Sequence, residues 1–232
     1  MAQKESSSKL IRDYGLAALL AVLIALFIRF FVIEAYRIPS QAMRPTLEAG
    51  DTVFVAKSTY GLRTPWSTKP FSAGRMPHYG EVVIFSFPDE PRKDFIKRVV
   101  GLPGDTVELK KGKLLLNGKP VTIETSSKSL CGEEKIPTPS GSPLVRYPVC
   151  WEPPHLELTK PMLIGENQIF VVGDARSEFP EYKPAKNWAL VPLSSLKGRA
   201  LWVWLSIDPQ GDRAPSSWFS RVRFERMFRP IN

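Results

Sequence analysis

The longest apolar run of the chain occupies residues 14–33, which read YGLAALLAVLIALFIRFFVI and include one charge, Arg29. A run of about 20 apolar residues is long enough to cross a bilayer as a helix. Arg29 lies near its end, where a long side chain can reach the headgroups. A cleaved signal peptide is the alternative, but its apolar core usually has about 7–15 residues and precedes a small-residue cleavage site. Because Glu34-Ala35-Tyr36-Arg37 is a poor cleavage site, the pattern favours an uncleaved transmembrane anchor.

The charges that flank this run indicate its orientation. The head, residues 1–13, carries Lys4, Lys9 and Arg12, and positive charge favours the cytoplasmic side. Arg37 and Arg44 on the other flank weaken the asymmetry. We therefore expect residues after about 35 to lie on the far side of the membrane.

After the anchor, the apolar positions form short alternating stretches, which are typical of β-strands. Asn117-Gly118 predicts a hairpin, and Pro103-Gly104-Asp105 predicts a turn. The 22 prolines argue against further long helices. The expected fold is mostly β: an N-terminal transmembrane helix, then a β-rich domain with an inserted, loop-rich cap. The predicted strands are Thr52–Lys57, Glu81–Phe87, Asp94–Val100, Thr106–Leu109, Lys113–Leu116, Gln168–Val172 and Arg199–Leu205.

The predicted cap carries both cysteines of the chain, Cys131 and Cys150, in a stretch rich in proline and serine. In an oxidising compartment they would pair, close a loop of about 20 residues and stabilise the fold by about 3 kcal/mol. Two unpaired buried thiols are the alternative. The expected segments are a cytoplasmic head (1–13), the anchor (14–33), the first part of the β core (34–125), the disulfide-closed cap (126–161) and the second part of the core (162–232).

The C-terminal segment SSWFSRVRFERMFRPIN mixes aromatic residues with arginines. This mixture suits a membrane interface, but an edge strand with one face on the core explains it equally well. The net charge of +9 fits either nucleic acid or anionic lipid as a partner. Because no zinc-finger spacing or Gly-rich phosphate loop is present and the anchor favours lipid, we expect a bilayer and no nucleic acid.

The sequence lacks the residue patterns of a Ser-His-Asp hydrolase and of a zinc hydrolase. The two histidines, His78 and His155, accompany no nucleophile signature, so a Ser-His-Asp triad is not expected. HExxH is absent, and two cysteines with His155 do not make a zinc site. We expect no metal and no cofactor.

A lysine can serve as the base instead, and Lys97 in DFIKRVVGLPGD is the candidate. In a strand, Phe95, Lys97 and Val99 share one face. Apolar neighbours would desolvate the amine and lower its pKa, as a general base requires. From the strand alone, a solvent-facing lysine on an edge strand is the better interpretation.

Two longer motifs change that interpretation. Residues Pro39–Asp51, PSQAMRPTLEAGD, resemble the nucleophile box of the type I signal peptidases (the bacterial leader peptidase family), Pro-Ser-x-Ser-Met-x-Pro-Thr-Leu followed by Gly-Asp. Lys97 begins Lys-Arg-Val-x-Gly-x-Pro-Gly-Asp, which matches the family's general-base box. Gly173-Asp174, Arg176 and Trp188 resemble its last box. The likeness covers nearly the whole chain after residue 14.

The resemblance implies a serine endopeptidase that removes signal peptides from exported preproteins by a Ser/Lys dyad and an acyl-enzyme. Lys97 would be the general base, and position 42 would carry the nucleophile. The Ser40 hydroxyl and the N–H of residue 42 would form the oxyanion hole, and Ile38, Pro39 and Met43 would contact substrate. Its implied partners are signal peptides and the lipid bilayer. The implied location is the bacterial inner (cytoplasmic) membrane, with a single pass and the catalytic domain on the periplasmic side.

The chain departs from the family pattern in two places. Ala42 stands where the family has its nucleophilic serine, so we expect an inactivated form. The last box, read here as Gly173-Asp174-Ala175-Arg176-Ser177 and then Lys186-Asn187-Trp188, lacks the serine that orients the lysine. The alternative is a natural non-catalytic relative that binds signal peptides or organises a membrane complex. The retained Lys97 favours the enzyme, because a buried lysine is costly to keep.

Overall fold

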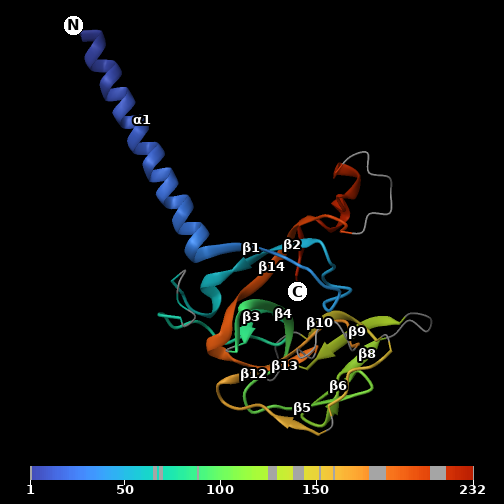
Figure 1. Cartoon of the computed structure of the whole chain (residues 1–232). Helices are drawn as coiled ribbons and strands as arrows, with labels where there is room; N and C mark the ends of the chain where they lie inside the picture. Colours follow the sequence, from blue (N-terminus) through green and yellow to red (C-terminus); the bar gives the residue numbers. More distant parts are fainter. Residues whose placement is uncertain are drawn as a thin grey trace.

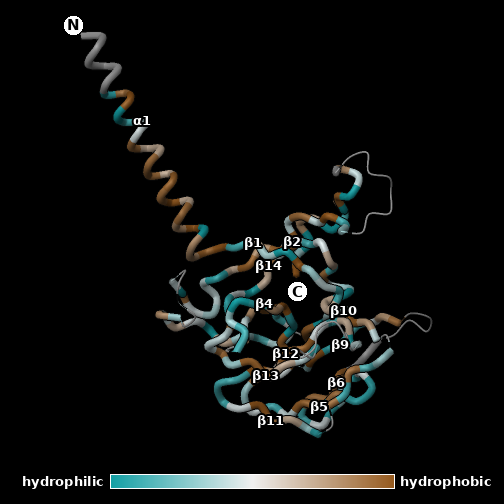
Figure 2. The backbone as a smooth tube through the Cα atoms, viewed as in Figure 1, coloured by the Kyte–Doolittle hydropathy of each residue, from teal (hydrophilic) through white to brown (hydrophobic). Residues whose placement is uncertain are grey.

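The computed structural model describes residues 2–64, 67, 70–87, 89–124, 130–137, 144–151, 153–158, 160–177, 187–209 and 218–231, without the side chains of residues 2–8, 122–124 and 218. A long N-terminal helix projects from a β domain (Figure 1). Helix α1 (Ala2–Phe27) continues through a π-helical turn (Ile28–Val32). The stretch Lys9–Val32 is long and apolar enough to cross a membrane, and none of its most apolar window is buried in the protein. Figure 2 shows its apolar residues extending away from the domain.

The largest sheet has eight strands, in the order β1-β2-β14-β3-β4-β12-β13, with β15 paired to β14. Every neighbouring pair in it is antiparallel. Its strands are β1 (Ile33–Arg37), β2 (Asp51–Ala56), β3 (Val82–Phe87), β4 (Glu90–Gly101), β12 (Gln168–Val172), β13 (Trp188–Pro192), β14 (Leu196–Ser206) and β15 (Arg229–Pro230).

Two smaller antiparallel sheets lie beside it. One contains β11 (Met162–Leu163), β5 (Thr106–Lys110), β6 (Lys113–Leu116) and β7 (Lys119–Pro120), and the other contains β10 (Val145–Cys150), β9 (Cys131–Ile136) and β8 (Thr122–Glu124). The turn between β6 and β7 has positive φ at both Asn117 (53°) and Gly118 (73°), which is the geometry of a two-residue hairpin loop. Short 3₁₀ turns occupy Lys57–Tyr60, Leu193–Ser195, Trp218–Arg221 and Phe224–Arg226.

The predicted fold class is confirmed, and each predicted strand is present to within a few residues. The predicted cap is less loop-rich than expected, because β9 and β10 form a hairpin within residues 126–161. The disulfide between Cys131 and Cys150 joins two directly paired positions of this hairpin. The prolines in this stretch obscured the strands: Pro148 lies inside β10, where Tyr147 and Val149 nevertheless point into the core.

Apolar residues pack on both faces of the central strands. One cluster joins β2, β3 and β14 to Ile38, Met43 and Leu47. A second covers the other face of β3 and β12, and a third lies under the smaller sheets. Burial on both faces explains why β3 reads as a nearly continuous apolar run, VVIFSF.

The C-terminal segment has both buried and exposed side chains, and its contact with a membrane interface stays a prediction. Phe219, Phe224 and Phe228 are exposed, whereas Ile231 and Arg226 are buried. β15 extends the main sheet by pairing with β14. Among the described residues of this segment, only Arg229–Pro230 joins the sheet, and the exposed aromatic side chains come from and around the 3₁₀ turns that precede it.

Candidate active site

The turn that presents residue 42 is held in place by backbone hydrogen bonds and by packing against the core. β1 leads into it, and backbone hydrogen bonds join Ile38 to Asp51 (2.7 Å) and Gly50 to Ile38 (2.9 Å). The side chains of Ile38, Met43 and Leu47 are buried in the core cluster. Ala42 is 4% exposed. Apolar packing and closing hydrogen bonds thus hold the backbone of residue 42 in a fixed position.

Two C-terminal arginines brace the same turn. Arg226 binds the Asp51 carboxylate at 2.7 Å, and Arg223 binds Glu48 at 2.7 Å and Asp51 at 3.2 Å. Burial alone would raise the pKa of Asp51, but the hydrogen bonds from Arg226, Glu48 N–H and Ser206 outweigh it and lower the pKa. This role could not be predicted from the sequence, because the arginines lie some 170 residues beyond the turn.

Lys97 occupies a buried position on β4, opposite Val83 of β3. Its side-chain neighbours on the same face of the strand, Phe95 and Val99, belong to an apolar cluster. The residue is 8% exposed, and burial lowers its pKa from 10.5 to about 7, against a weaker attraction from the Asp174 carboxylate. The amine therefore loses its proton near neutral pH.

Asn187 is the hydrogen-bond partner of this amine. Lys97 Nζ donates to Asn187 Oδ1, and Asn187 Nδ2 donates in turn to the carbonyl oxygens of Ala175 and, at 3.3 Å, Ser177. The two Nδ2 bonds orient the amide so that its oxygen faces the lysine. Sequence reasoning missed this residue, although it directly precedes Trp188 in the last box.

Gly173 brings this amide next to the backbone of residue 42. A Cβ built on Gly173 would overlap both Asn187 Oδ1 and the carbonyl oxygen of Ala42. The N–H of Ala175 also donates to the Ala42 carbonyl at 3.2 Å. The atom that receives the Lys97 hydrogen bond and the backbone of Ala42 therefore lie on the same side of Gly173.

A buried ion pair ties together the three motifs found in the sequence. Arg98 binds Asp174 through two bonds, of 2.8 and 2.7 Å, and neither side chain is exposed. The Thr46 hydroxyl donates to Asp174 and accepts from Arg98 at 3.1 Å. Thr46 belongs to the turn, Arg98 follows Lys97, and Asp174 follows Gly173, so this pair fixes the relative positions of residues 42 and 97.

The disulfide hairpin supports the same segment from the other side. Cys150 N–H donates to the Asp174 carbonyl at 3.0 Å, and Arg176 N–H donates to the Cys150 carbonyl at 2.7 Å. Buried Arg176 also pairs with Glu134, which accepts a bond of 2.8 Å from the Tyr147 hydroxyl. β9 and β10 thus hold residues 174–176 in place.

The remaining predicted site residues differ in accessibility. Ser40 is half-buried, Pro39 is exposed, and Ile38 and Met43 are buried. Within the described part of the chain, neither the Ser40 hydroxyl nor the Ala42 N–H has a hydrogen-bond partner. The oxyanion hole predicted for Ser40 and residue 42 stays a prediction. The predicted contact of Ile38, Pro39 and Met43 with substrate stays a prediction, and Pro39 offers the accessible surface among them.

No metal constellation accompanies these groups. Among the residues that the structure describes, no three His, Cys, Asp or Glu side chains are grouped so that they could hold a metal ion.

Comparisons with known proteins point to one family. Residues 11–205 match the family model described as signal peptidase, peptidase S26. The chain is 35% identical over 240 residues to signal peptidase I of Pseudomonas aeruginosa, a match that covers 95% of this chain and 81% of that protein. It is 26% identical over 268 residues to signal peptidase I of Haemophilus influenzae, with 93% and 75% covered.

A solved structure, a signal peptidase I from Enterococcus faecalis, is 23% identical, with 54% of this chain and 97% of that chain covered. Its TM-score of 0.31 is too low for that likeness to support the fold.

Proposed function

Because the chain belongs to the signal peptidase family, peptidase S26, we propose that its site is built to remove signal peptides from preproteins by a Ser/Lys dyad. The observation that carries this proposal is the placement of Lys97. Its amine is buried, has a pKa of about 7, and is directed by Asn187 toward the backbone that presents residue 42. A lysine in this state can act as a general base.

The steps follow from the groups at the site. With a serine at position 42, neutral Lys97 would take the hydroxyl proton while the oxygen attacks the carbonyl carbon of the scissile peptide bond. The Ser40 hydroxyl and the N–H of residue 42 would bind the oxyanion. The protonated lysine would then protonate the leaving amine, and a water activated by the same lysine would release the acyl group.

Ala42 removes the attacking atom from this sequence of steps. The chain as it stands has no acyl acceptor at position 42, although alanine deletes a single oxygen and leaves the rest of the site intact. By analogy with catalytic triads, groups other than the nucleophile sustain rates of only about 10³–10⁴ over water. We infer that this chain binds signal peptides but does not form an acyl-enzyme.

Ala42 also favours a second candidate function. A natural relative without a nucleophile could bind signal peptides, or organise a membrane complex, and never cut. The buried Lys97 distinguishes the two functions, because a pure binder gains nothing from an amine whose burial costs free energy.

We also infer that the protein is a single-pass protein of the bacterial inner membrane with its β domain on the periplasmic side. The apolar stretch Lys9–Val32 supports the anchor. The disulfide supports the periplasmic location of the β domain, because disulfides persist in the periplasm and not in the cytosol.

The test is a comparison of binding and cleavage. The unchanged chain and Ala42→Ser, both in lipid–detergent micelles, receive a labelled preprotein with an Ala-x-Ala-like site. We expect both to bind it and only Ala42→Ser to cut it. Binding by both with cleavage by neither would support the non-catalytic function, and binding by neither would exclude a role in signal-peptide recognition.

A further inference from the structure

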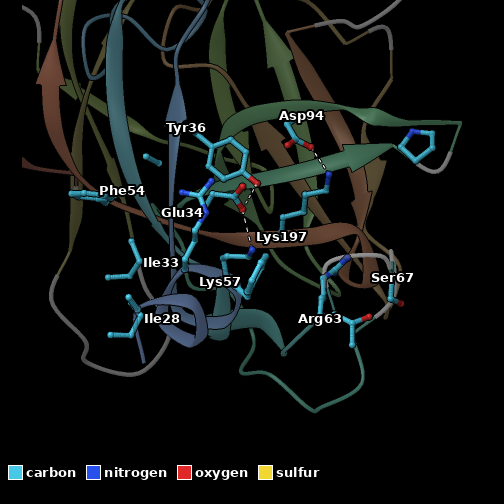
Figure 3. Close-up of a pocket in the computed structure, with 16 residues that line it drawn as sticks. Ile28, Ile33, Glu34, Tyr36, Phe54, Lys57, Arg63, Ser67, Asp94 and Lys197 are labelled. Carbon is cyan, nitrogen blue, oxygen red and sulfur yellow. Dashed lines mark hydrogen bonds and ion pairs between the residues drawn. The ribbon is translucent and has the colours of Figure 1, made fainter. Parts of the chain in front are cut away.

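A cavity of about 970 Å³ is lined by the end of the apolar helix, by β1 and by neighbouring residues of the sheet, and residue 42 is not part of its lining. Its lining has two kinds of side chain (Figure 3). Ile28, Ile33 and Phe54 form an apolar part, and Arg63, Asp94 and Lys197 lie beyond Glu34 and Lys57 in that view. The cavity therefore changes from apolar to charged across its width.

The charged part carries an excess of positive charge. Four basic residues line it, together with two acidic ones: Arg29, Lys57, Arg63 and Lys197, with Glu34 and Asp94. Lys57 binds Glu34 at 3.1 Å, and Lys197 binds Asp94. Both carboxylates are thus paired within the cavity, and its lining contains more basic than acidic side chains.

The two arginines are placed differently. The Arg63 guanidinium donates to the carbonyl oxygens of Ser194 (2.7 Å) and Leu196, which hold it in place. Arg29 lies in the π-helical turn and is exposed. Among the described residues, no carboxylate pairs with Arg29.

The last part of the apolar stretch Lys9–Val32 lines the cavity with Ile28, Arg29 and Phe30. If this helix spans the bilayer, the cavity faces the layer in which lipid phosphates lie. A phospholipid has the matching chemistry, because its phosphate would meet the basic part and its glycerol and first acyl carbons would meet the apolar part. The volume falls within the range of about 300–1,000 Å³ usual for small-molecule sites.

We propose that this cavity binds the headgroup of an anionic phospholipid. The bound lipid would fix the angle between the helix and the sheet, and so the height of residue 42 above the membrane. This inference rests on the proposed membrane anchor but not on cleavage, because lipid binding can be measured on the unchanged chain. Failure of Ala42→Ser to cut a preprotein would leave it untouched.

The test measures lipid retention by the full-length chain. Phosphatidylglycerol is titrated into neutral detergent micelles that contain the protein, and bound lipid is counted by native mass spectrometry. A basic residue near a membrane surface is worth about 1 kcal/mol of attraction to anionic lipid, which is about fivefold in affinity. We expect Arg29→Gln to weaken phosphatidylglycerol binding about fivefold.

A matched control separates this site from general attraction to a basic protein. Lys113 is exposed on β6, in a sheet remote from α1 (Figure 1), and Lys113→Gln removes the same charge. Equal losses in Arg29→Gln and Lys113→Gln would overturn the proposal. So would equal retention of phosphatidylcholine and phosphatidylglycerol, since the site would then not recognise charge.

Two competitors exclude other occupants. Free glycerol 1-phosphate at millimolar concentration should not displace the lipid, because it lacks the acyl chains that reach the apolar part. Displacement by it would show a site for soluble phosphates and contradict the proposal. Displacement by an uncharged signal peptide would assign the cavity to substrate and also contradict it.

Discussion

The Lys97 amine donates a hydrogen bond to the side-chain oxygen of Asn187, which lies 90 residues further along the chain. The Asn187 amide is itself held by the carbonyls of Ala175 and Ser177. A neutral acceptor of this kind orients the amine without adding the negative charge that would keep it protonated. We therefore propose Asn187 as a positioning residue for Lys97, in a chain that lacks the serine with which the family orients its lysine.

Replacing that neutral acceptor by a carboxylate should shift the pH dependence of cleavage. In Ala42→Ser, kcat/KM should rise about tenfold per pH unit below pH 7 and level off above it, because only the neutral amine accepts a proton. Adding Asn187→Asp to Ala42→Ser should raise the pKa of Lys97 by roughly 1–3 units. The rise of kcat/KM should then occur at a correspondingly higher pH. Asn167→Asp, at an exposed position, is the control. If the pH profile of kcat/KM does not shift, Asn187 does not position the Lys97 amine.

The buried amine should also lower stability at low pH. The pKa of Lys97 falls from 10.5 to about 7 on folding, so between these values the unfolded chain binds a proton that the folded chain does not. The free energy of unfolding should therefore rise with pH through this window. Lys97→Met should stabilise the domain below pH 7 by about 3–5 kcal/mol and show little difference near pH 10. Chemical denaturation at several pH values checks this, with exposed Lys113→Met as the control.

A side chain at residue 173 should disrupt the site. Because the Cβ of Gly173→Ala would overlap Asn187 Oδ1 and the Ala42 carbonyl oxygen, we expect cleavage by Ala42→Ser to drop at least about 100-fold when the two changes are combined, as a misplacement of about 1 Å can cost. Gly165→Ala is the control, because its Cβ would meet its nearest neighbour, Gln168, at 3.4 Å. Similar activity in both variants would mean that residues 42 and 187 are not packed against residue 173.

The Arg98–Asp174 pair should contribute to stability as well as to geometry. Asp174→Ala leaves the fully buried Arg98 without its carboxylate, which typically costs about 3–5 kcal/mol. Glu90→Ala breaks the exposed pair between Glu90 and Lys93 and should cost at most about 1 kcal/mol. Thermal or denaturant unfolding of the two variants provides the comparison, and equal losses would show that the buried pair is not a support of the site.

The sequence predicted the parts of this protein that depend on local patterns. The membrane-spanning length of the apolar run, the alternation in β2, β5 and β6 and the Asn117-Gly118 turn all follow from neighbouring residues. The family resemblance is confirmed by the match of residues 11–205 to the peptidase S26 model. The roles of Lys97, Ser40 and position 42 stay predictions that the geometry supports.

The features that the sequence did not predict depend mostly on contacts between distant segments. The roles of Asn187, Arg98, Asp174 and Arg226 appear only when β4, the turn after β1 and the segment before β13 are brought together. The hairpin of β9 and β10 was missed because its prolines and charges conceal a short alternation. The contacts of Asn187, Arg98, Asp174 and Arg226 have no local signal, because each joins segments that lie far apart along the chain.

The central claim is that neutral Lys97 acts as the general base for a serine at position 42. The most direct measurement compares cleavage of one preprotein by Ala42→Ser and by Ala42→Ser/Lys97→Met in the same micelles at pH 8. We predict that the first variant cuts the preprotein after its signal peptide and that the second loses about 10²–10⁴ of that rate, the usual contribution of a general base. Equal rates in the two variants would contradict the account.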